Sequence, residues 1–215
     1  MEPIFSGAPT GASTLAPSHA QLALRLASRL CPAQEGAANA ALEELAAELR
    51  GAHALPAREQ IAEVFMTMEP LRTVTTGLSH DELRVDRVLE HRAGHPLALT
   101  AIALDIARRA GLDLGVAAHD GGHVVAHRRV AEPMGLDFSR DGDHRVRAVP
   151  IGPLAWRCPH QLGSAIVAEL VERGVRGGDI GLALRAAEAT FTMPLAPHDA
   201  QAARVRLGAL RATLN

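Results

Sequence analysis

Histidine side chains that could act as bases or metal ligands gather in the second half of the chain. His119, His123 and His127 recur every fourth residue, so on one continuous strand their imidazoles would share a face and could form a ligand set. Gly121-Gly122 interrupts this spacing and favours a break in the strand, which would separate the first imidazole from the others. Clustering by chance is the alternative, because the chain has 11 histidines.

The two cysteines are the candidate thiol nucleophiles. Cys158 lies in Trp156-Arg-Cys-Pro-His160, where the neighbouring imidazole of His160 could act as a base that activates the thiol. A small packed side chain is the alternative, and we interpret Cys31, before Pro32 on a leucine-rich stretch, in that way. Because the cysteines lie far apart and form no C-x-x-C motif, we predict neither a disulfide framework nor a thiolate zinc site.

Composition and charge exclude several classes of function. Lys+Arg 22 against Asp+Glu 24 gives a net charge of -2, so we expect no overall electrostatic attraction to nucleic acid or to an anionic membrane. The sequence has no lysine, which excludes a Schiff-base lysine, a pyridoxal-phosphate anchor and a phosphate-loop lysine. Neither a secretory peptide nor a membrane span is recognisable. We therefore expect a cytoplasmic protein with no cofactor and no nucleic-acid or membrane partner.

Helical spacing of apolar residues dominates the first half of the chain. The clearest helix is predicted from Pro96 to Ala110, because proline suits a first helical turn and Gly111 follows as a stop signal. This helix is apolar on nearly every side, which predicts a central, buried position. Ser79 to Glu82 is interpreted as a capping box. The other predicted helices lie within residues 18–30, 41–49, 56–68 and 83–89.

A small antiparallel sheet is predicted after the central helix, and helices return at the end of the chain. Short β-like runs cover 114–118, 124–126 and 146–149, and a Gly/Pro-rich joint covers 150–153. Helical patterns then occupy 162–171, 179–194 and 200–210. We predict a flexible arm at 1–17, a first domain at 18–153 and a C-terminal helical tail at 154–215 that packs on the core.

The segment from Arg84 to Leu112 resembles the core of the SirB1 family, bacterial proteins with a transglutaminase-like domain followed by tetratricopeptide-like helices. The likeness extends from about Ser79 to Met193. It is carried by Val88-Leu89-Glu90, Arg92, Gly94, Pro96-Leu97, Ala107-Arg-Arg-Ala-Gly-Leu112, Gly122-His-Val-Val125, Leu136-Asp-Phe138, Gly178-Asp179, Ala183-Leu184 and Pro194.

The resemblance implies an α+β fold with a transglutaminase-like, papain-like core, in which a buried central helix packs on a small antiparallel sheet. It also implies a cysteine at the start of that helix, a histidine on the facing strand and an aspartate on the next strand. His123 takes the histidine position and Asp137 the aspartate position. Pro96 takes the cysteine position, so thiol-based transglutaminase or protease activity is not expected.

Two classes of function stay open. The chain is either a binding and interaction protein for a small molecule or a peptide, or an enzyme that reuses the cleft at His123 and Asp137. In the enzyme alternative, His123 is the base and Asp137 orients it in acid/base or acyl-transfer chemistry without a cofactor. His95 lies beside Pro96, and both are candidates for substrate binding. His95, His123 and Asp137 together form an alternative metal-ligand set.

Overall fold

The computed structural model describes residues 18–77, 79–119, 122–128, 134–139, 145–148, 154–194 and 197–213, with the backbone alone at 145–148. The arm expected over 1–17 and the joint expected at 150–153 lie outside these residues.

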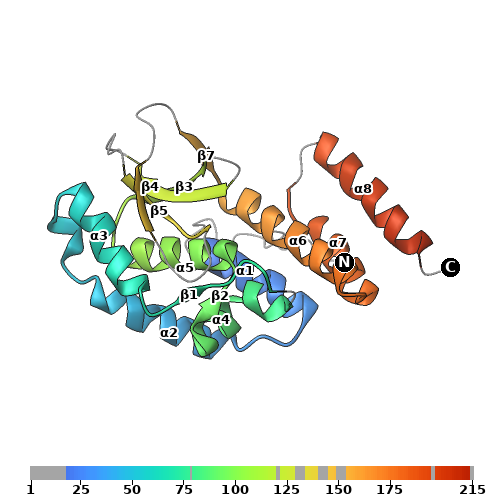
Figure 1. The fold of residues 1–215 in the computed structure, drawn as a ribbon, viewed down its shortest axis with the longest axis horizontal. Helices are drawn as coiled ribbons and strands as arrows, with labels where there is room; N and C mark the ends of the chain where they lie inside the picture. Colours follow the sequence, from blue (N-terminus) through green and yellow to red (C-terminus); the bar gives the residue numbers. More distant parts are fainter. Residues whose placement is uncertain are drawn as a thin grey trace, which may run out of the picture.

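Helices form most of the described chain, and a five-stranded sheet lies among them (Figure 1). The helices are α1 His19–Leu30, α2 Glu35–Glu48, η1 Ala52–Ala54, α3 Ala57–Met68, η2 His80–Leu83, α4 Val85–His91, α5 Pro96–Arg109, α6 Pro159–Arg176, α7 Ile180–Thr190 and α8 Pro197–Ala212. The strands are β1 Arg72–Thr73, β2 Ala93–Gly94, β3 Leu114–His119, β4 Gly122–His127, β5 Met134–Asp137, β6 Arg145–Ala148 and β7 Ala155–Arg157.

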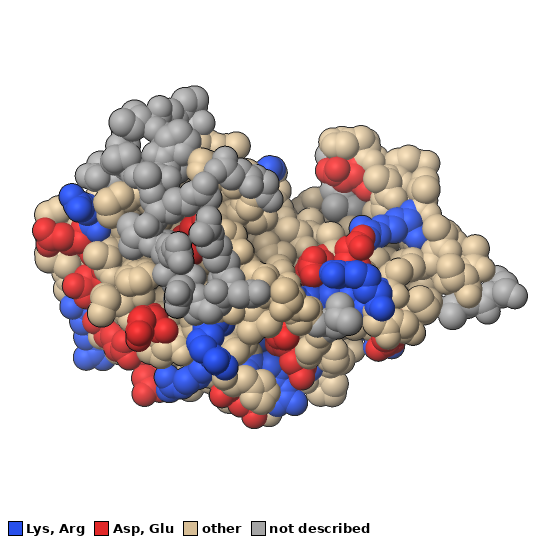
Figure 2. All heavy atoms as spheres, viewed as in Figure 1, with Lys and Arg blue, Asp and Glu red and all other residues tan. Residues whose placement is uncertain are grey.

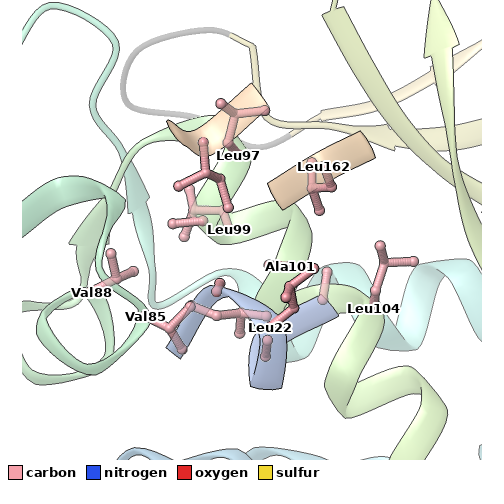
Figure 3. Close-up of a cluster of buried hydrophobic side chains, with 14 of the residues drawn as sticks. Leu22, Val85, Val88, Leu97, Leu99, Ala101, Leu104 and Leu162 are labelled. Carbon is pink, nitrogen blue, oxygen red and sulfur yellow. The ribbon is translucent and has the colours of Figure 1, made fainter. Parts of the chain in front are cut away.

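Helix α5 is the centre of the core. Eleven consecutive residues, from Leu97 to Ala107, are buried, because α1, α2 and α4 pack on one side of the helix and the sheet covers the other. Figure 3 shows Leu97, Leu99, Ala101 and Leu104 of α5 among side chains from α1, α4 and α6. An apolar stretch that is buried on all sides needs such a surround, since any exposed face would leave hydrocarbon in water.

The sheet is antiparallel, with the strand order β6-β5-β4-β3-β7. Its register assigns each side chain to one of two faces, because residues that pair directly across an antiparallel ladder point the same way. Val116, Val125 and Leu136 belong to the main core and define the face toward α5. Ala117 and Val124 pack with Leu154 on the opposite face.

The C-terminal helices extend from the sheet along one side of the molecule (Figure 1). Helix α6 packs on α1 and α5, and α7 folds back against α6. The close approach of α6 and α7 requires Gly174, because a Cβ there would lie 2.8 Å from the backbone nitrogen of Ala183. Helix α8 packs on α7 and leaves most of its length exposed, although Leu210 is buried.

The α+β prediction, with a buried central helix and a small antiparallel sheet, is confirmed. The helix predicted from Pro96 begins there, whereas α2 begins at Glu35, six residues before the apolar stripe that predicted it. The sheet has two strands, β5 and β7, that the β-like runs did not include. Ser79 does not form the expected capping box: its hydroxyl accepts the Asp81 amide at 3.2 Å and starts the short helix η2.

No described helix is long and apolar enough to cross a membrane. On the face shown in Figure 2, basic and acidic side chains mix along the lower edge of the molecule, over α2 and α4. This mixture agrees with the net charge of -2.

Candidate functional site

His95 is fixed at the start of the central helix by its own backbone and ring. It is the N-cap of α5, and its Nδ1 accepts the Leu97 amide at 3.3 Å. The His95 amide donates to the carbonyl of Glu82 at 2.7 Å, which ties the helix start to η2. Because Nδ1 accepts a hydrogen bond, the neutral ring carries its proton on Nε2. Pro96 follows as the first helical residue.

The environment of His95 keeps its imidazole neutral. The pKa of His95 is lowered from 6.5 to about 4, mainly by burial and next by the positive charge of Arg173, while Glu169 acts in the opposite direction. His123 also lies near enough for its protonated form to disfavour protonation of His95. The two histidines therefore lie within electrostatic range of each other.

His123 belongs to the sheet face that covers α5. It pairs with Ala118 in the β3–β4 ladder, and it shares its face with Val125, a member of the core. Burial lowers its pKa, and the charge of Arg157 lowers it further. Arg157 lies opposite Val116, which places its side chain on the same face as His123. The His123 ring is therefore unprotonated at neutral pH.

Asp137 points to the other side of the sheet. It pairs with Val124, so its side chain shares the face of Val124, whereas the neighbouring His123 lies on the α5 face. The Asp137 carboxylate accepts the Ser139 amide at 2.8 Å. The strand backbone thus separates the two members of the expected acid/base pair, and this arrangement does not provide the direct carboxylate–imidazole contact that such a pair uses.

A buried arginine network borders His95. The Arg173 side chain is 0% exposed, forms an ion pair with Glu82, and donates to Glu169 at 3.0 Å. Arg173 also donates to the Ser79 carbonyl, and its Nη2 has no hydrogen-bond partner in the described part of the chain. The network connects α6 to η2 and supplies the positive charge that acts on His95.

The other candidate residues from the sequence, two cysteines and one histidine, lie elsewhere in the fold. Cys158 is exposed at the N-cap of α6, and its amide donates to the Gln161 side chain at 2.9 Å. Cys31 ends α1 with its sulfur 4.0 Å from Nε2 of His80, so it has a polar neighbour in addition to its packing. His119 pairs with Gly122, so it lies on the face opposite His123.

No group of three or more histidine, cysteine, aspartate or glutamate side chains converges on a possible metal position among the residues with described side chains. His95 and His123 supply two nitrogen donors, but Asp137 lies across the sheet from them. The geometry therefore does not assemble the three-residue ligand set.

Sequence reasoning missed Arg173 and Arg157. Arg173 follows Ile166 and Leu170 at helical spacing, so a charged residue at a position that should face the core was the available signal. No comparable signal marks Arg157, because its place next to His123 depends on the pairing of β7 with β3, strands that are far apart in the sequence.

Comparison with known proteins supports the fold and its central segment. A sequence model of a protein family, described as the transglutaminase-like superfamily, matches residues 36–136. This range runs from α2 to the third residue of β5 and includes α5, Pro96 and His123, so the chain contains a transglutaminase-like domain there. The match ends one residue before Asp137 and does not reach α6, α7 and α8. No curated protein and no solved structure matches the chain.

Proposed function

We propose that this protein is a SirB1-like binding protein on a transglutaminase-like core, which uses the site at His95, Pro96 and His123 without thiol chemistry. The observation that carries the proposal is Pro96 at the first position of α5. The resemblance gives that position to the nucleophilic cysteine, and proline has no side chain that can attack an acyl carbon.

The electrostatics of the site favour hydrogen bonding to a neutral polar group. His95 uses Nδ1 for the helix cap, so its free Nε2–H can donate a hydrogen bond, while the neutral ring of His123 has one nitrogen that donates and one that accepts. An amide or a carbonyl of a small molecule or a peptide meets these requirements. Burial strengthens such contacts, because water competes less for the ring nitrogens.

An amine-transfer assay tests this proposal. Incorporation of a fluorescent amine into casein is measured for the native protein and for a Cys31→Ser/Cys158→Ser variant. We expect background incorporation for both proteins, because no thiol lies at the start of α5. Turnover by the native protein that disappears in the double variant would contradict the proposal and would identify a relocated nucleophile.

The unprotonated state of His123 favours a second candidate, an acid/base enzyme without a cofactor. A general base must be unprotonated at the working pH, and the lowered pKa of His123 satisfies this condition. Hydrolysis of p-nitrophenyl acetate separates the two functions. The enzyme candidate requires hydrolysis above background that His123→Ala removes without lowering the melting temperature, and the binding candidate requires equal background rates.

The C-terminal helices are proposed to form a tetratricopeptide-like tail over 154–215 that follows a domain at 18–153. The antiparallel packing of α6 and α7 resembles one helical repeat, and the contacts of α6 with α1 and α5 hold the tail on the core. Deletion of residues 197–215 tests the role of α8. Since most of α8 is exposed, we expect the shortened chain to keep its folded core.

A further inference from the structure

A cavity of about 460 Å³ lies between α6, α7 and α8, and Arg157 of β7 also lines it. Its volume falls in the range of pockets that hold small organic ligands, roughly 300–1,000 Å³. Figure 1 shows α8 apart from α6 and α7, and Figure 2 shows the surface hollowed between the body of the molecule and α8.

The walls of this cavity are apolar in the centre and polar at the edge. Val171 of α6 and Ala187 of α7 are buried and form the apolar floor, and further alanines from α6 and α8 keep the walls small. Gln161 supplies a polar group near the start of α6. This pattern suits a ligand with an apolar body and one polar end.

The charges at the edge select the polar end of the ligand. Arg206 already pairs with Glu172, and Asp199 pairs with its neighbour His198 at 3.1 Å. Arg157 also lines the cavity, and the ion pairs that the described side chains form around the cavity do not include it. An arginine guanidinium binds a carboxylate through two parallel hydrogen bonds. The negative charge of Asp199 disfavours a ligand with a second anionic group.

We propose that the cavity between α6, α7 and α8 binds a small monocarboxylate with an apolar body, and that Arg157 pairs with the carboxylate. Arg157 also lies near His123, so binding there would partly neutralise the charge that lowers the pKa of His123. The pKa of His123 should therefore report whether a carboxylate occupies the cavity.

Calorimetric titration with octanoate tests the proposal, and octylamine is the matched ligand with the same chain and the opposite charge. We expect octanoate to bind the native protein and octylamine to bind at least about tenfold more weakly. Arg157→Gln should weaken octanoate binding by about tenfold or more. Arg211→Gln, an exposed arginine of α8 that pairs with Glu188, should leave the affinity unchanged.

A second variant tests the cavity itself. Ala202→Trp fills the space from an exposed position on α8, so the core stays intact while octanoate binding should be lost. Octanoate should also raise the pKa of His123 in the native protein, as measured by NMR of the imidazole ring. Three results would overturn the proposal: no octanoate binding at about 10 mM, equal affinity in Arg157→Gln, or equal binding of octylamine.

Discussion

Replacement of Arg173 by methionine is the most informative perturbation of the scaffold. The substitution keeps an unbranched apolar side chain in place of the arginine stem but removes the guanidinium charge that lies between Glu82 and Glu169. It also removes the donor to the Ser79 carbonyl. Both carboxylates then remain near the core with one fewer cation, and α6 loses its polar link to η2.

The expected loss of stability follows from the burial of this network. Breaking a buried ion pair by removing one partner costs about 3–5 kcal/mol. The Glu82 side chain is 20% exposed, and Glu169 keeps Arg176 at 3.2 Å, so both carboxylates retain some compensation. We therefore expect the low end, about 3 kcal/mol. For a chain of this size, that corresponds to a fall in melting temperature of about 6–12 °C.

Urea and thermal unfolding followed by circular dichroism measure the loss. Arg176→Met is the control, because its side chain is 54% exposed and should contribute about 1 kcal/mol or less. Adding Glu82→Gln to Arg173→Met should recover part of the stability, since the uncompensated carboxylate is gone. A loss below about 1 kcal/mol for Arg173→Met, or no recovery in the double variant, would refute the reasoning.

Three further predictions concern the site and its supports. Arg157→Gln should raise the pKa of His123, because a nearby positive charge is removed, and NMR titration of the ring measures the change. The free energy of unfolding of the native protein should decrease as pH falls from 6.5 to about 4, because the unfolded chain protonates His95 first. His95→Asn keeps a capping side chain and should make this decrease shallower in pH-dependent urea unfolding. Gly174→Ala should cost about 1–3 kcal/mol by pushing α6 from α7, whereas Gly208→Ala, with no atom within 4 Å of the added Cβ, should stabilise the chain by about 0.5–1 kcal/mol.

The sequence predicts the elements of this fold better than their contacts. Pro96 and the apolar run behind it were sufficient to locate α5 and its burial, because capping and periodicity act within one helix. Strand β7 escaped prediction, since three residues carry too little pattern and the strand is defined by its partner β3.

The candidate site shows the same limit. The resemblance to the SirB1 family implies that His123 and Asp137 form a pair, but the register of β4 and β5 decides which face each side chain takes. A shift of one residue in that register reverses the outcome, and no local signal in the sequence reports it. The role of Arg173 likewise depends on contacts with Glu82, which is 91 residues away in the chain.

The central claim is that His95 and His123 are neutral and that Asp137 does not contact His123, and the pKa values of the two rings test it most directly. NMR titration of ring-labelled protein should show His95 with a pKa of about 4 and His123 with a pKa below its ordinary value. Neither value should change in Asp137→Ala, because that carboxylate lies across the sheet. A His123 pKa at or above 6.5 in the native protein that falls in Asp137→Ala would show a direct imidazole–carboxylate pair and would contradict the account.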